Sequence, residues 1–175
     1  MKPRGFTLIE LMITISIAAI LLAIAVPSFQ GLMNSTRLTG TTNEVVAALS
    51  QARSEAIRTN ARVSICASNN NTACTGLVGG AWPGFIVFTN PNNDAIVDPG
   101  ETVVRTGTFS GNTQIKPVAP GVARVTFGAD GLPTPLNAAI TVCLPVTNPP
   151  ENLRTITLSA GGVRTVRTNN AGACP

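Results

Sequence analysis

The acidic segment from Asn90 to Glu101 holds the residues of this 175-residue chain whose types and spacing most resemble a chemical site. Asp94, Asp98 and Glu101 fall at positions 5, 9 and 12 of a calcium-loop template, so their carboxylates are the candidate ligands for Ca²⁺. The template is incomplete, because Asn90 replaces the first acidic ligand and Ala95 replaces the glycine of the sharp turn. We therefore favour a polar loop without a cofactor and keep calcium as the alternative.

Catalysis has little support in the rest of the chain. There is no histidine, no tyrosine and no glycine-rich phosphate loop, so the common acid–base, triad and nucleotide sites lack their parts. We expect a protein that is not an enzyme. The remaining enzyme hypothesis, a membrane-anchored periplasmic enzyme using the carboxylates from Asp94 to Glu101, has no feature that argues for it.

Glu10 is the second acidic residue in an unusual setting. It is the only charge in the run from Phe6 to Val26, whose 21 residues match the roughly 20 that cross a bilayer as a helix. A charge at such a position costs about 2.5–3.5 kcal/mol on insertion scales, so it is normally retained for a partner. Lys2 and Arg4 precede the run without any acid, which predicts a cytoplasmic N-terminus and an exported body.

The sequence Gly-Phe-Thr-Leu-Ile-Glu at residues 5–10 resembles the class III signal of type IV pilins and pseudopilins. A secretory signal peptide would be cut after its apolar region, whereas here the motif precedes that region. The resemblance implies that a prepilin peptidase cleaves between Gly5 and Phe6 and that Phe6 is N-methylated. It also implies that Glu10 faces the amine of a neighbouring subunit. An ordinary single-pass anchor with an incidental glutamate is the alternative.

Four cysteines in an exported chain predict disulfides, and three pairings are allowed. We favour Cys66–Cys74, which closes a short polar loop, and Cys143–Cys174, which holds the C-terminal tail to a strand. A zinc site is disfavoured because the chain has no histidine and no C-x-x-C spacing.

The periodicity of the chain changes near Asn60. Before it, a helical stripe with three- and four-residue spacing predicts one helix from about Phe6 to Asn60, kinked at Pro27. The stripe consists of Leu38, Thr42, Val45, Leu49, Ala52 and Ala56. After it, short β-branched runs alternate with turn residues and predict strands near 63–66, 85–88, 102–105, 114–116, 124–127, 140–143, 155–158 and 163–168.

These elements predict an α+β fold in which the long N-terminal helix packs on an antiparallel β-rich head. The expected divisions are a leader at 1–5, a transmembrane helix at 6–26, an amphipathic continuation at 27–60 and a head at 61–175. Gly128-Ala-Asp-Gly131 predicts a hairpin turn. Trp82 and Phe85 are expected in the core, because aromatics are few, rather than at a ligand shelf.

The segment from Ala81 to Asn90, the acidic loop and Phe127-Gly-Ala-Asp-Gly131 resemble the GspH/FimT family of minor pilins and pseudopilins. The resemblance implies a helix against two sheets and a subunit of a type IV pilus or a type II secretion pseudopilus. Its partners would be other pilins or pseudopilins, the prepilin peptidase and the inner-membrane assembly platform. It implies location in the inner membrane with the head in the periplasm, and at a filament tip after assembly. Of the two assemblies, we slightly favour the type IV pilus over the secretion pseudopilus.

The C-terminal arginines raise DNA as a further partner. Once Lys2 and Arg4 are removed from the twelve basic residues, ten basic side chains face eight acidic ones, so the charge is nearly balanced. Asn152 to Pro175, however, holds Arg154, Arg164 and Arg167 and no acid. DNA-binding FimT-like pilins carry Gly-Arg-x-Arg, and only half of that motif is present at Gly162-Val-Arg164. We favour arginines on a solvated strand, and keep DNA uptake as the alternative.

Overall fold

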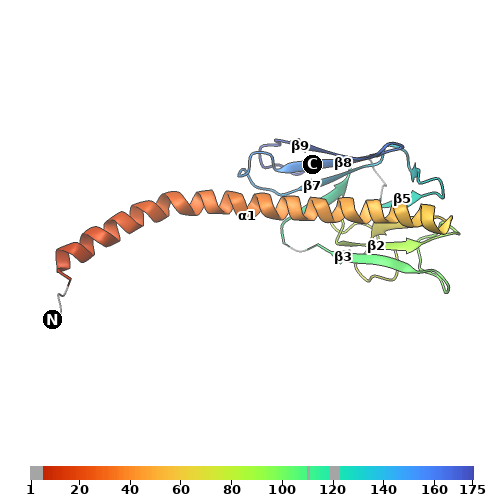
Figure 1. Ribbon diagram of the computed structural model, residues 1–175, viewed down its shortest axis with the longest axis horizontal. Coiled ribbons are helices and arrows are strands. Elements are labelled where there is room, and N and C mark those ends of the chain that lie inside the picture. The colour runs from red at the N-terminus through yellow and green to blue at the C-terminus, as the bar shows by residue number, and fades with distance from the viewer. Residues whose placement is uncertain (1–5, 110, 119–122) are drawn as a thin grey trace.

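The computed structural model describes residues 6–109, 111–118 and 123–175, so the predicted leader, including Gly5, lies outside the described residues. A single helix, α1 (Leu8–Thr59), occupies the first third of the chain. It begins at the N-cap Thr7 and ends at Asn60, which adopts the left-handed conformation that asparagine tolerates at a helix end. The helix continues through Pro27, with a gentle curve along its first half (Figure 1).

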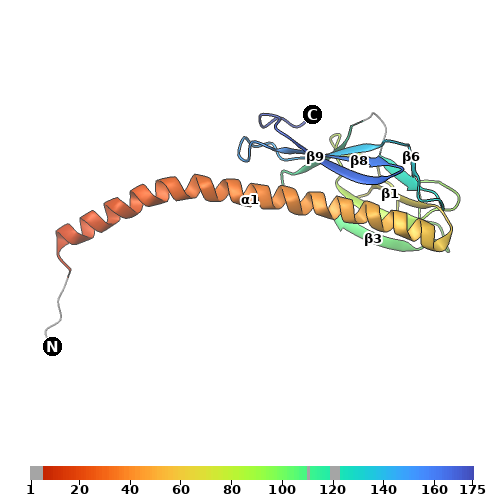
Figure 2. The same ribbon diagram turned by 45° about the horizontal axis from the view of Figure 1, so that its top comes forward.

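The two halves of α1 have different surroundings. The first half projects away from the head, and its large apolar side chains are exposed from Phe6 to Met33 (Figures 1 and 2). The second half lies against the head. All six residues of the predicted stripe are buried there, each at most 4% exposed, which confirms the helical pattern between Leu38 and Ala56.

The head contains two antiparallel sheets, one on each side of α1 in Figure 1. The first has the order β3-β2-β1-β5-β6 and the second has the order β4-β7-β8-β9. The strands are β1 (Val63–Ala67), β2 (Gly84–Thr89), β3 (Val103–Thr108), β4 (Gln114–Pro117), β5 (Arg124–Phe127), β6 (Pro133–Thr134), β7 (Ala139–Cys143), β8 (Leu153–Ser159) and β9 (Gly162–Thr168). The predicted α+β fold is confirmed.

All eight predicted strands are present, and one short strand was missed. The predicted turn from Gly128 to Gly131 connects β5 to β6, with Phe127 opposite Pro133. Two backbone hydrogen bonds close this turn, from Gly128 N to Leu132 O and from Gly131 N to Gly128 O. No strand was predicted at β6 because this strand has two residues and begins with a proline, which donates no hydrogen bond to a ladder.

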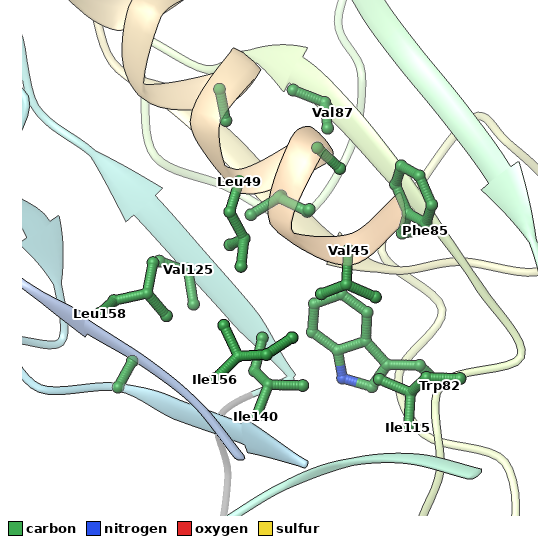
Figure 3. Close-up of a cluster of buried hydrophobic side chains, with 14 of the residues drawn as sticks. Val45, Leu49, Trp82, Phe85, Val87, Ile115, Val125, Ile140, Ile156 and Leu158 are labelled. Carbon is green, nitrogen blue, oxygen red and sulfur yellow. The ribbon is translucent and has the colours of Figure 1, made fainter. Parts of the chain in front are cut away.

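The main core lies between α1 and both sheets. Figure 3 shows Val45 and Leu49 of α1 with Phe85 of the first sheet on one side and Ile156 of the second sheet on the other. Trp82 lies beside Val45 and Ile115. Trp82 is 3% exposed and Phe85 is 1% exposed, so both belong to the core, as expected. This packing holds the head rigidly on the second half of the helix, because burial of apolar surface is the main stabilising contribution.

Candidate functional site

The N-terminal end of α1 places Glu10 beside the start of the helix. The side-chain oxygen Oε2 of Glu10 accepts hydrogen bonds from the backbone nitrogen and the hydroxyl of Thr7, each at 3.0 Å. The Thr7 hydroxyl in turn accepts a bond from the backbone nitrogen of Glu10 at 3.3 Å, which completes a capping box. Phe6, the residue predicted to become the N-terminus, lies four residues before Glu10 in the chain and is 88% exposed.

The helix around Glu10 fits a membrane by length and composition. An 18-residue stretch of α1 is apolar enough to cross a bilayer, and none of it is buried within the protein. Leu8, Ile9, Leu11 and Met12 are each more than half exposed. The carboxylate therefore stands on an apolar surface that only lipid or other apolar helices would cover.

The loop between β2 and β3 brings the three predicted calcium ligands together. Carboxylate oxygens of Asp94, Asp98 and Glu101 lie within 4.8 Å of one another. Oε2 of Glu101 accepts a hydrogen bond from the backbone nitrogen of Asp98 at 2.9 Å. Oε1 of Glu101 is buried and has no hydrogen-bond partner among the described residues, which is an unfavourable state for a carboxylate oxygen.

Asn90 and Asn92 support this loop rather than complete a calcium template. Asn90 is fully buried, and its amide donates to Ser64 Oγ and to the backbone oxygen of Asp94, each at 2.9 Å. The amide of Asn92 donates to carboxylate oxygens of Asp94 and Asp98 at 2.9 and 2.7 Å. Calcium ligation by the three carboxylates therefore stays a prediction, and Asn92, which occupies position 3 of the same template, donates to two of those carboxylates.

The three C-terminal arginines do not share one surface. Arg154 on β8 lies opposite Arg167 on β9, whereas Arg164 lies opposite Thr157. Because successive strand residues point to opposite faces, Arg154 and Arg167 share the face turned towards α1 and Arg164 points to the other face. Arg164 and Arg167 therefore lie on opposite faces of β9, as the alternation of side chains along a strand predicts. The three arginines do not form a continuous row that could contact a nucleic-acid backbone.

Both predicted disulfides are present. Cys66 of β1 is bonded to Cys74 across eight residues, and Cys143 of β7 is bonded to Cys174 across 31 residues. Asn152 reinforces the second bridge, because its amide donates to the backbone oxygens of Leu144 and Ala173, each at 3.1 Å. The C-terminal tail is therefore fixed to the second sheet.

Two polar contacts connect α1 to loops of the second sheet, and no local pattern predicted either contact. Arg53 Nη2 donates to the backbone oxygen of Ala160, in the turn between β8 and β9, at 3.0 Å. Asn34 Nδ2 donates to the backbone oxygen of Asn148 at 3.0 Å. The partners are more than 100 residues apart in the chain, so only the fold brings them together.

A long helix that projects an apolar half from a two-sheet head, with a lone carboxylate near its N-terminus, defines a pilin-like protein. The model of the type II transport protein GspH family matches residues 41–172, and that of the prokaryotic N-terminal methylation motif matches residues 1–26. The chain belongs to the GspH family. No curated protein matched.

Two solved structures share the fold. The type IV minor pilin FimU of Pseudomonas aeruginosa is 21% identical with a TM-score of 0.55, and the match covers 82% of this chain and 96% of FimU. The minor pseudopilin EpsH from the type 2 secretion system of Vibrio cholerae is 10% identical with a TM-score of 0.51, and the match covers 75% of this chain and 97% of EpsH. Both confirm the expected pilin-like architecture.

Proposed function

We propose that this chain is a structural subunit, not an enzyme, of a type IV pilus or a type II secretion pseudopilus. The prepilin peptidase cleaves after Gly5, the new Phe6 amine is methylated, and the apolar half of α1 holds the subunit in the inner membrane. The head then stands in the periplasm. On assembly the helices bundle, and the head contacts other minor subunits at the filament tip.

The position of Glu10 carries this proposal. Its carboxylate stands among exposed apolar side chains, and in the described part of the chain its hydrogen-bond donors all belong to Thr7. The amine at Phe6 of a neighbouring subunit would supply an opposite charge in a dry environment, where an unpaired carboxylate is costly. Assembly thereby converts an unfavourable charge into a paired one.

The exposed apolar side chains of α1 support the same conclusion. Helices that bundle in a filament replace lipid contacts with close packing, which is favoured by small and aliphatic residues on the contact face. The alternative of a DNA receptor has less support, because the register places Arg164 on the opposite face from Arg154 and Arg167.

The N-terminus of the mature chain tests the processing step. Intact mass spectrometry of the chain purified from the host inner membrane should show Phe6 as the first residue, carrying one methyl group. A host that lacks prepilin peptidase provides the control, in which the first five residues should remain. Retention of those five residues in the normal host would contradict the proposal.

A further inference from the structure

A small basic pocket lies where α1 meets the second sheet. It has a volume of about 260 Å³ and is lined by Thr39, Thr42 and Asn43 of α1, Arg154 of β8, and Thr165 and Arg167 of β9. Among the residues that the structure describes, the lining groups are two guanidinium groups, three hydroxyls and one amide, and no carboxylate is among them.

Arg154 is buried in this pocket without a carboxylate partner. Its residue is 4% exposed, and its Nη1 donates to the backbone oxygens of Glu151 and Leu153 at 2.6 and 3.3 Å. Its Nε and Nη2 make no hydrogen bond to any residue that the structure describes, and no carboxylate of those residues lies within 4.0 Å of its guanidinium. Neither of these two nitrogens is fully buried, so an added acceptor in the pocket can reach both of them.

Arg167 adds a second positive charge directly across the ladder. Like charges opposite each other on neighbouring strands destabilise a sheet. Burial and then the nearby charge of Arg167 lower the pKa of Arg154, and the charge of Glu151 offsets part of that effect. The nearest acid to Arg167 is Glu151, at 3.9 Å, but both side chains are more than half exposed, so their attraction is weak.

We propose that this pocket binds one oxyanion group, a carboxylate or a phosphate, between Arg154 and Arg167. The free Nε and Nη2 edge of Arg154 provides the planar pair of donors that matches two oxygens of such a group. Thr39, Asn43 and Thr165 supply neutral donors around it. A pocket of this size, with Arg164 on the far face of the strand, fits a single group better than a nucleic-acid backbone.

An acidic side chain of a neighbouring subunit is one source of that group, and this source depends on the proposed function. Met33 is the last large exposed apolar residue in the first half of α1. Thr39 lies six residues further on, or about 9 Å along the helix. A subunit packed along the apolar half would therefore bring its own side chains close to the pocket. Free phosphate is the other source.

Arginine-directed modification by phenylglyoxal tests the site in the full chain, solubilised in detergent. Mass spectrometry would follow Arg167 and, as an internal control on the same exposed strand, Arg164. Inorganic phosphate is compared with sodium chloride at the same ionic strength. At a phosphate concentration about ten times the Kd of the pocket for phosphate, modification of Arg167 should be about tenfold slower, because an occupied pocket does not react. The rate at Arg164 should not change.

A variant shows whether the buried arginine is needed. Arg154→Gln should abolish the phosphate effect at Arg167, and Thr165→Val provides a milder change if the first variant does not fold. Equal rates at Arg167 with and without phosphate would overturn the proposal. Equal slowing at Arg164 and Arg167 would also overturn it, because that result is ordinary charge screening.

Assembled filaments distinguish the two sources. If Arg167 is protected in phosphate-free filaments while Arg164 still reacts, the oxyanion is a carboxylate of a neighbouring subunit. If Arg167 reacts freely in filaments but phosphate protects it in detergent, the pocket binds a free anion. Failure to form filaments would contradict the proposed function alone, because the detergent measurement does not depend on assembly.

Discussion

Oε2 of Glu10 accepts two hydrogen bonds from Thr7, from the backbone nitrogen and from the hydroxyl, both at 3.0 Å. The spacing of the two residues is that of a capping box, in which each side chain satisfies a backbone donor at the start of a helix. In a membrane this contact gives the carboxylate local partners before assembly. Under the proposed function, the charge itself would remain uncompensated until the amine of a neighbouring subunit approaches.

The Thr7 hydroxyl should matter for the first turn of the helix. Thr7→Val keeps the shape of the side chain but removes the cap, which is expected to cost about 1 kcal/mol of local helix stability. Amide hydrogen exchange at residues 8–11 in detergent should become several-fold faster. Thr14→Val is the matched control, because the Thr14 hydroxyl donates only to the Leu11 backbone within the described chain. Unchanged exchange at residues 8–11 would show that the capping box does not stabilise this end.

The two disulfides should contribute unequally to stability. In the chain-entropy treatment, the 31-residue separation of Cys143 and Cys174 is worth about 3.7 kcal/mol, and the eight-residue separation of Cys66 and Cys74 about 2.5 kcal/mol. Denaturant unfolding of the two double Cys→Ser variants should therefore show the larger loss for Cys143 and Cys174. A larger loss for Cys66 and Cys74 would mean that the tail is held mainly by Asn152 and the packing around it.

Calcium binding by Asp94, Asp98 and Glu101 is tested by thermal unfolding. If the three carboxylates bind the ion, calcium chloride added after chelator treatment should raise the Tm of the full chain in detergent, and Glu101→Gln should remove that rise. Asp130→Asn is the control, because Asp130 lies in the β5–β6 turn, where it accepts a bond from Leu132 N. An equal Tm with and without calcium would contradict calcium binding and leave the loop with a structural role only.

Glu55 should contribute a small pH dependence to the stability of the helix end. Hydrogen bonds from Arg58, at 2.5 and 2.9 Å, lower the pKa of Glu55 below its usual value. The folded state therefore binds the proton more weakly than the unfolded state, so this contribution is present above the unfolded pKa and is lost as the pH falls through the lowered one. Glu55→Gln should reduce the difference in Tm between neutral and acidic solution. An unchanged difference would contradict this role.

The periodicity of the sequence was sufficient to predict the helix stripe and the eight longer strands. The two disulfides were instead favoured among three pairings because one closes a short polar loop and the other holds the C-terminal tail. Local patterns succeed here because Leu38, Val45 and Leu49 repeat at helical spacing and the strands are rich in β-branched residues. The Thr7–Glu10 contact was not predicted, although its three-residue spacing is that of a capping box.

The pocket between α1 and β9 could not be predicted from local patterns. It depends on the register that sets Arg154 opposite Arg167 and on the packing of Thr39 and Asn43 against those strands. A shift of one residue would have placed Arg167 on the other face. In the same way, Asn90 occupies position 1 of the calcium template in sequence, but in the fold it is buried and its amide donates to Ser64 and to the Asp94 backbone.

Incorporation of Glu10 variants into filaments tests the central claim most directly. The amount of chain in sheared filaments, relative to the amount in the inner membrane, should fall to background for Glu10→Leu, because the neighbouring amine loses its counter-charge. Glu10→Asp, which keeps the charge on a shorter side chain, should retain part of the incorporation. Incorporation of Glu10→Leu at the level of the unchanged protein would contradict the account.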